Sequence, residues 1–250
     1  MSEVLKTRVE DGVCILTLNR PEQLNAFNDD LYDAVTDGLR RAATDDAVSV
    51  VVITGEGRAF SAGQDLAELE NPRQHDDPQA HGFPLFIATV ESFPKPLIAA
   101  INGLGVGIGL TLLPHCDLVL MADDARLRAP FVSLGVTVEA GNSYLLPATV
   151  GWQAASHLLY TASWIDAERA VEIGLAFRTV PASTLMEETL AMAKEIAAMP
   201  LDSLVGTKQL LLDSRLDFIR AARSRENVTF ASLRGRPANR AAIEAFKKKS

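Results

Sequence analysis

Gly57-Arg-Ala-Phe-Ser-Ala-Gly-Gln-Asp-Leu66 and Asn102-Gly-Leu-Gly-Val-Gly-Ile-Gly109 are the two stretches on which the fold prediction depends. Each follows a short apolar run typical of a buried strand, residues 49–54 before the first and 96–101 before the second. Glycine-rich turns that lead into a helix can present backbone N–H groups to an anion, and two converging N–H groups form an oxyanion hole. Taken singly, each stretch is better explained by tight turns and close packing, so the functional interpretation depends on the pair.

Strands and helices alternate in the first part of the chain, and helices dominate after Gly141. A β-hairpin is expected around Asp11-Gly12, and Asn28 is a good N-cap for an amphipathic helix that ends near Ala43. The strands of the hairpin are residues 4–9 and 13–19, further short strands are predicted at 117–122 and 126–128, and a short apolar run occupies 175–180. This order predicts an α/β core followed by a C-terminal helical subdomain.

Composition and charge exclude several classes of protein. The 250 residues are 48% hydrophobic and 22% charged, which suits one large globular domain, or a domain with a helical appendage. A net charge of −8 disfavours nucleic acid and anionic membranes as partners. Basic residues gather from Arg215 onward, and such a stretch suits a small anionic ligand or a neighbouring subunit.

The sequence also bears on the cellular compartment. Cys14 and Cys116 lie in apolar surroundings without CxxC spacing, which argues against a disulfide framework and fits a reducing compartment. The first residues lack the apolar core of a signal peptide, and no apolar run is long enough to span a bilayer. The ending Lys-Lys-Lys-Ser is not a peroxisomal address. We therefore expect a cytoplasmic protein.

Common nucleotide and hydrolase motifs are absent. The second glycine stretch does not fit GxGxxG, and the chain has no P-loop, no GxSxG and no HExxH. His75 and His81, with Asp76 and Asp77 between them, could in principle hold a metal. The polar segment 71–82 with its two prolines is better explained as a solvated, mobile loop, followed by a helix to about Phe93. We therefore expect no metal site.

Several segments, taken together and in order, resemble the enoyl-CoA hydratase/isomerase (crotonase) superfamily. They are residues 19–27, 57–66, 95–110, 116–130, 134–141 and 170–180. They cover nearly the whole chain, and their order and spacing carry the resemblance, which no single segment would. The resemblance implies an α/β fold of the ClpP/crotonase type, with a spiral of ββα repeats in residues 1–190. It also implies a C-terminal α-helical subdomain in residues 191–250 that serves trimerisation.

The resemblance further implies an acyl-CoA substrate, bound by a homotrimer or a dimer of trimers, with no cofactor beyond the coenzyme A of the substrate. In the family, one oxyanion N–H belongs to the residue after the glycine of the first motif, here Gln64. The second maps to Ile108 at the start of a helix. Contacts with the substrate or with CoA are implied for Leu24, Asn25, Ala26, Ala62, Asp65, Thr111, Phe131 and, for the CoA phosphates, lysines 247–249.

Three positions bear on the reaction. A hydratase of this family holds water between two carboxylates, and the corresponding positions here are Thr111 and Phe131, neither of which is acidic. Glu139 matches the position at which a subset of the family's isomerases carries its single catalytic acid. One carboxylate suffices to move a proton from the α to the γ carbon of a 3-enoyl-CoA. A base among apolar neighbours such as Phe131 should have a raised pKa, which suits this role.

The predicted activity is therefore isomerisation of 3-enoyl-CoA to trans-2-enoyl-CoA, with Glu139 as the base. The alternatives left open are an enoyl-CoA hydratase, a ring-epoxide acyl-CoA isomerase with an acid at the same place, and a non-catalytic acyl-CoA-binding homologue. Asp65 and Glu68, the other acids near the first glycine stretch, are expected to have capping or structural roles. The length and shape of the acyl group are left open.

Overall fold

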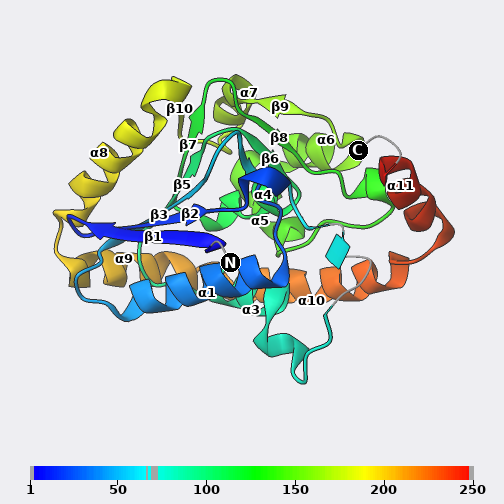
Figure 1. Cartoon of the computed structure of the whole chain (residues 1–250), viewed down its shortest axis with the longest axis horizontal. Coiled ribbons are helices and arrows are strands. Elements are labelled where there is room, and N and C mark those ends of the chain that lie inside the picture. Colours follow the sequence, from blue (N-terminus) through cyan, green and yellow to red (C-terminus); the bar gives the residue numbers. More distant parts are fainter. Residues whose placement is uncertain (1–2, 66, 69–72, 248–250) are drawn as a thin grey trace.

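Two sheets form the core of the fold (Figure 1). The six-stranded sheet has the order β1-β2-β3-β5-β7-β10, and the four-stranded sheet has the order β4-β6-β8-β9. The larger sheet consists of β1 (Leu5–Glu10), β2 (Val13–Leu18), β3 (Val50–Gly55), β5 (Leu97–Ile101), β7 (Leu118–Ala122) and β10 (Arg178–Val180). The smaller sheet consists of β4 (Ala59–Ser61), β6 (Leu104–Val106), β8 (Arg126–Arg128) and β9 (Ile165–Asp166). This computed structural model describes residues 3–65, 67–68 and 73–247.

The first two strands form the predicted hairpin. Asp11 and Gly12 at its turn have φ angles of 48° and 78°, and positive values at both positions favour the twist of a hairpin. β1 pairs antiparallel with β2, whereas β2, β3, β5, β7 and β10 run parallel. Parallel strands are covered on both faces, which explains why residues 50–53 are apolar without alternation.

A strand of the larger sheet, a strand of the smaller sheet and then a helix recur along the chain. The units are β3 and β4 before α3 (Gly82–Val90), β5 and β6 before α4 (Ile108–Thr111), and β7 and β8 before α5 (Asn142–Val150). This repetition is the ββα spiral that the resemblance implied, and the predicted fold class is confirmed.

The two glycine stretches are more regular than expected. We expected turns, but the short strands β4 and β6 lie inside them and pair in parallel, with Ala59 opposite Leu104 and Ser61 opposite Gly105. The glycines permit this close approach, since a Cβ on Gly109 would lie 2.7 Å from the carbonyl oxygen of Ser61 in β4. The expectation of simple turns was wrong because strands of three residues leave almost no periodic pattern in a sequence.

The first long helix, α1 (Asp29–Thr44), begins and ends close to its predicted limits. The side chain of Asn28 accepts a hydrogen bond from the backbone N–H of Leu31 at 3.0 Å, as expected of an N-cap. Helix α1 packs along α3, which ends at Val90 rather than at Phe93. Side chains of these two helices pack beside the candidate site described below.

Helices dominate the second half of the chain, as predicted. They are α6 (Trp152–Thr161), α7 (Ala167–Glu172), α8 (Leu185–Ala197), α9 (Leu201–Asp213), α10 (Leu216–Leu233) and α11 (Pro237–Lys247). Short 3₁₀ helices are η1 (Pro21–Gln23), η2 (Pro78–Ala80), η3 (Leu113–His115), η4 (Val132–Leu134) and η5 (Ala182–Thr184). Of the apolar run 175–180, only β10 is a strand.

The C-terminal helices spread around the sheets (Figure 1). Helix α8 packs against β2, β3, β5 and β7, and the boundary expected between residues 190 and 191 lies within it. Helix α10 packs against α5, and α11 contacts η4. Within the described part of the chain, no helix combines the length and the apolar character needed to cross a membrane.

Candidate active site

The backbones of the two glycine stretches touch at Gly63 and Gly107. A Cβ on Gly63 would lie 3.0 Å from the carbonyl oxygen of Val106, and a Cβ on Gly107 would lie 3.8 Å from the Cα of Gly63. Both glycines have positive φ, 97° and 57°, which residues with a Cβ rarely adopt. The residues that follow them, Gln64 and Ile108, are therefore brought side by side.

The backbone N–H groups of Gln64 and Ile108 have no partner within the described part of the chain. The neighbouring peptides are bonded, because Phe27 donates to Gly63 O at 2.7 Å and Asp65 donates to Phe27 O at 2.8 Å. Ile108 is the first residue of α4, where a backbone N–H has no partner within the helix. Among the described residues, neither N–H donates a hydrogen bond to a backbone acceptor or to a side chain. Two neighbouring free donors of this kind can bind an oxyanion.

Glu139 lies in the segment between η4 and α5, and the residue is partly exposed. No described residue donates a hydrogen bond to this carboxylate. Burial, followed by the negative charge of Glu226, raises the pKa of Glu139 to about 8. An unpaired carboxyl group with such a pKa is suited to take up and release a proton near neutral pH.

The backbone around Glu139 is held by groups from distant segments. Glu226 on α10 accepts hydrogen bonds from the N–H groups of Gly141 at 2.7 Å and Ser143 at 2.6 Å, so its carboxylate caps the start of α5. His115 donates from Nε2 to the carbonyl oxygen of Ala140 at 2.8 Å. Burial lowers the pKa of His115 to about 4, so its ring is neutral and donates this bond.

Two contacts connect the Glu139 segment to the free amides. Asn142 donates from Nδ2 to the carbonyl oxygen of Thr111 at 2.8 Å, and Thr111 belongs to α4, the helix that Ile108 begins. The negative charge of Glu139 also contributes to the raised pKa of Tyr32. The Tyr32 hydroxyl in turn donates a hydrogen bond to Oε1 of Gln64 at 2.9 Å. The acid and both amides therefore belong to one region of the molecule.

Thr111 and Phe131 are buried and carry no acid into this region. The Thr111 hydroxyl donates to the carbonyl oxygen of Gly107 at 3.2 Å, and the Phe131 side chain is 6% exposed. Both therefore shape the packing around the amides and contribute no second carboxylate.

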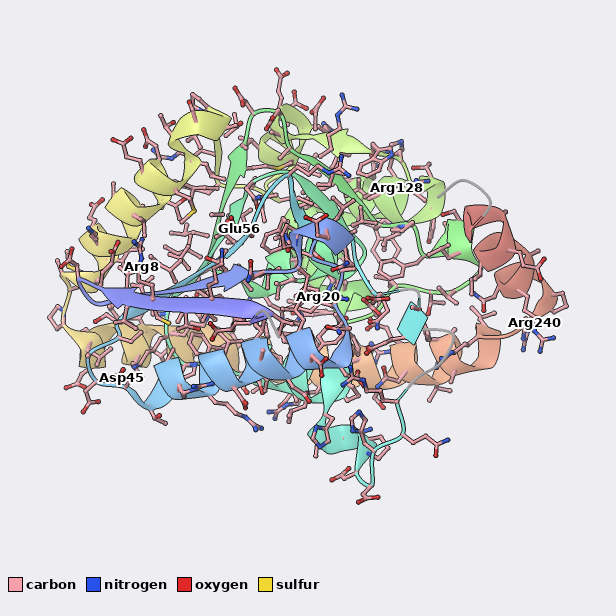
Figure 2. All side chains as sticks on the ribbon, in the orientation of Figure 1. Arg8, Arg20, Asp45, Glu56, Arg128 and Arg240 are labelled. Atoms are coloured by element: carbon pink, nitrogen blue, oxygen red, sulfur yellow. The ribbon has the colours of Figure 1, made fainter. Side chains whose placement is uncertain are left out.

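The residues expected to contact CoA lie around the first glycine stretch. Leu24 has a positive φ of 51°, and its carbonyl oxygen accepts from the N–H of Ala62 at 2.9 Å. The carbonyl oxygen of Ala26 accepts from Arg20. Arg20 also pairs with Asp65 at 2.9 Å (Figure 2 shows Arg20 toward the middle of the view). Asp65 is thus engaged in a structural ion pair, as expected from its position.

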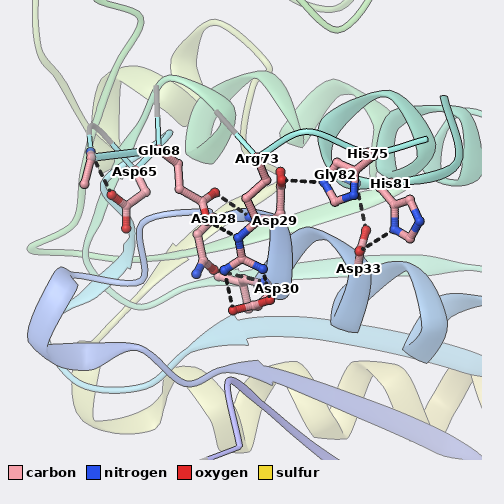
Figure 3. Close-up of polar contacts among 12 residues, drawn as sticks. Asn28, Asp29, Asp30, Asp33, Asp65, Glu68, Arg73, His75, His81 and Gly82 are labelled. Carbon is pink, nitrogen blue, oxygen red and sulfur yellow. Dashed lines mark hydrogen bonds and ion pairs between the residues drawn. The ribbon is translucent and has the colours of Figure 1, made fainter. Parts of the chain in front are cut away.

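Glu68 has the capping role expected of it (Figure 3). Its carboxylate accepts from the backbone N–H of Asp29, the first residue of α1, at 2.7 Å. Arg73 forms an ion pair with Glu68 at 3.2 Å and donates two hydrogen bonds, of 2.5 and 2.8 Å, to Asp30. These contacts hold Glu68 and Arg73 at the N-terminal end of α1.

The two histidines of the polar loop pair with acids of the same helix (Figure 3). His75 lies 2.9 Å from Asp29 and His81 lies 3.0 Å from Asp33, with the two rings stacked at 4.4 Å between centroids. Residues 71 and 72 of this loop lie outside the described residues. Among the residues that the structure covers, no group of three His, Cys, Asp or Glu could hold a metal.

The basic C-terminal stretch is partly neutralised within the chain. Arg220 and Arg223 on α10 pair with the buried Glu91 at 3.3 and 3.1 Å. Arg240 on α11 is exposed at the edge of the molecule (Figure 2). Lysines 248 and 249, expected to contact the CoA phosphates, lie outside the described residues.

Sequence analysis missed Tyr32. No motif in the sequence singled out this residue of α1, which is buried, with 1% exposure. A buried tyrosine hydroxyl needs a polar partner, which is the only signal in the sequence that could have pointed to the site.

Comparisons with known proteins agree with this geometry. A family model described as enoyl-CoA hydratase/isomerase matches residues 8–250. A 1,2-epoxyphenylacetyl-CoA isomerase of Escherichia coli (strain K12) is 33% identical over 259 residues, which cover 98% of this chain and 96% of the relative. A 2,3-dehydroadipyl-CoA hydratase of the same strain is 34% identical over 252 residues, which cover 100% and 97%. The crystal structure of an enoyl-CoA hydratase/isomerase from Pseudoalteromonas atlantica T6c matches with a TM-score of 0.94 at 34% identity, covering 98% of this chain and 97% of that one.

The chain therefore belongs to the enoyl-CoA hydratase/isomerase family, whose fold is that of crotonase. The family's members are enzymes, and an acyl-CoA substrate is consistent with membership. The similar proteins include both an isomerase and a hydratase, so membership does not decide the reaction. That decision depends on the residues of the site.

Proposed function

We propose that this chain isomerises 3-enoyl-CoA to trans-2-enoyl-CoA. The observation that carries the proposal is one unpaired carboxyl group, Glu139, with a pKa of about 8, in a region with two free backbone amides. Thr111 and Phe131 stand where a hydratase has its two acids, and neither can activate water. Moving a double bond needs one group that removes a proton and returns it, together with donors for the charge that develops on the thioester oxygen.

The proposed reaction has two proton transfers. The Glu139 carboxylate removes a proton from the α carbon of the 3-enoyl thioester, and the electron pair moves into a dienolate. The N–H groups of Gln64 and Ile108 donate hydrogen bonds to the oxygen of this dienolate. The carboxylic acid form of Glu139 then returns the proton at the γ carbon, and the double bond becomes conjugated with the carbonyl. Protons and electrons balance within the substrate and Glu139, so this chemistry needs no redox cofactor and no metal.

Proton exchange in heavy water tests the proposal on the wild type. With trans-3-hexenoyl-CoA, we expect deuterium at the α carbon of the recovered substrate or at the γ carbon of the conjugated product, measured by NMR and by ultraviolet absorbance. Crotonyl-CoA serves as the matched hydratase substrate, and its hydration should be slower by a large factor. Rapid hydration would establish the hydratase instead, and thioester binding without any exchange would favour a non-catalytic homologue. A ring-epoxide substrate would be tried next.

The pH dependence of the rate gives a second test. The base must be ionised, so kcat/KM should rise with pH and level off above about 8, the raised pKa of Glu139. Replacing Glu226 with Gln removes the negative charge that contributes to this shift, so the rise should move to lower pH. Glu187→Gln on α8 removes an exposed carboxylate and serves as the control. Identical pH profiles for the wild type and Glu226→Gln would contradict the electrostatic role of Glu226.

Assembly and location stay predictions. A homotrimer or a dimer of trimers would cover the large apolar side chains exposed on α9 and α10, which are Leu210, Leu211, Phe218 and Val228. A cytoplasmic location remains the expectation drawn from the sequence.

A further inference from the structure

The ring of Tyr32 is fixed by an aromatic cluster. Ring centroids of Phe27, Phe83 and Phe86 lie 4.7, 5.9 and 5.3 Å from that of Tyr32. Phe83 and Phe86 belong to α3, so two helices hold the ring. Tyr32 therefore presents its hydroxyl in one direction, toward Gln64.

The hydroxyl of Tyr32 is a permanent donor to Gln64. Burial and the charges of Glu139, Asp29 and Glu68 raise the pKa of Tyr32 well above its ordinary value, so the phenol stays protonated. It donates to Oε1 of Gln64 at 2.9 Å. This bond occupies the only acceptor atom of the Gln64 side chain and fixes the orientation of its amide.

The other end of that amide is unoccupied. Oε1 accepts from Tyr32, which leaves the Nε2 group of Gln64 with two N–H donors and no acceptor among the described residues. The side chain is partly exposed. Its own backbone N–H is one of the two proposed oxyanion donors, so the side chain begins beside the place of the thioester oxygen. Nε2 would therefore meet an acyl chain that runs from that thioester along the Gln64 side chain.

We propose that Gln64 is a specificity determinant that selects acyl-CoA substrates with an oxygen atom in the acyl chain, and that Tyr32 is the positioning residue that orients it. The inference rests on the acyl-CoA binding of the proposed function. A purely hydrocarbon chain displaces water from Nε2 and leaves its donors unpaired, whereas an ether, hydroxyl or carbonyl oxygen accepts a hydrogen bond. Sites built around a polar group reject analogues that leave it unpaired, so we expect a preference of about 10- to 100-fold.

Binding of saturated thioesters tests the inference without turnover. Hexanoyl-CoA is compared with 3-oxa-, 4-oxa- and 5-oxahexanoyl-CoA, in which one methylene group is replaced by oxygen at nearly constant shape. In wild type, we expect at least one oxa analogue to bind about tenfold or more tightly than hexanoyl-CoA by calorimetry. Gln64→Met should abolish this ratio, and Tyr32→Phe should reduce it, because the amide is then no longer held.

The ratio of two dissociation constants within one variant separates specificity from stability. A variant that is merely less stable weakens both ligands alike, and thermal melting verifies that each variant is folded. Tyr160→Phe removes an exposed tyrosine hydroxyl, with 73% exposure of the residue, and should leave the ratio unchanged. A wild type that prefers no oxa analogue, or a preference that survives in Gln64→Met, overturns the inference and leaves the isomerase proposal standing. A wild type that binds no thioester overturns both.

Discussion

Glu139→Gln should lose about 10³-fold or more of its turnover with trans-3-hexenoyl-CoA, in line with the contribution of a positioned general base. Glutamine has nearly the same shape as glutamate, but its amide cannot accept the α proton at any accessible pH. The carboxyl group accepts no hydrogen bond from the described residues, so its replacement breaks no bond that holds the fold. The affinity for the unreactive hexanoyl-CoA should therefore change little. Steady-state absorbance gives kcat, and calorimetry gives the dissociation constant.

The same exposed acid used above, Glu187, provides the control for Glu139. Glu187→Gln on α8 also removes one negative charge, and its turnover should stay at the wild-type level. If Glu139→Gln kept turnover within about tenfold of wild type, the assignment of Glu139 as the base would be wrong. Loss of thioester affinity together with turnover would instead indicate a role in binding.

Gly63→Ala should lower kcat by about 10²- to 10³-fold, because it misplaces one donor of the oxyanion hole. The backbone at Gly63 has φ of 97°, and the new Cβ would lie 3.0 Å from the carbonyl oxygen of Val106. Relieving this contact must shift the peptide that carries the N–H of Gln64. The measurement is kcat with the enoyl substrate, together with the melting temperature, since strain of this kind also lowers stability.

Two further glycine substitutions separate the effect of a misplaced oxyanion donor from a general effect of replacing glycine. Gly107→Ala introduces the strain of a φ of 57° on the other side of the hole, but the nearest described atom to its Cβ is the Cα of Gly63, at 3.8 Å. It should also lower kcat, through the amide of Ile108. Gly206 lies within α9, and no atom of the described residues is within 4 Å of a new Cβ, so Gly206→Ala should keep full activity and gain about 0.5–1 kcal/mol of stability. Full activity in a folded Gly63→Ala would refute the oxyanion assignment.

Glu139 was proposed as the base from the sequence, and the structure shows a raised pKa whose cause could be predicted only in part. Apolar neighbours were expected to raise the pKa of Glu139, and burial is indeed the larger cause. The second cause, Glu226, lies on α10 and reaches the start of α5 through hydrogen bonds to Gly141 and Ser143. No periodic pattern connects two acids so far apart in a sequence.

In the polar loop, too, the sequence could not predict the partners of titratable side chains. His75 and His81 with nearby acids left open a metal site in principle. In the folded chain each histidine pairs with a different acid of α1, Asp29 or Asp33. These partners come from a helix that precedes the loop by many residues, so the pairing follows from the packing of the loop on α1.

The sequence by itself determined the α/β order of the longer elements, the N-cap at Asn28, the hairpin turn at Asp11-Gly12 and the resemblance to the family. These features depend on local periodicity, on residues with special backbone preferences and on motifs that are contiguous in the chain. Only the tertiary structure decided which polar atoms are paired and which stay free, as at Gln64, whose backbone N–H is open while its side chain is held by Tyr32. The physical reason is that the partners of a polar atom come from segments distant in sequence, and their distances exist only once the chain has folded.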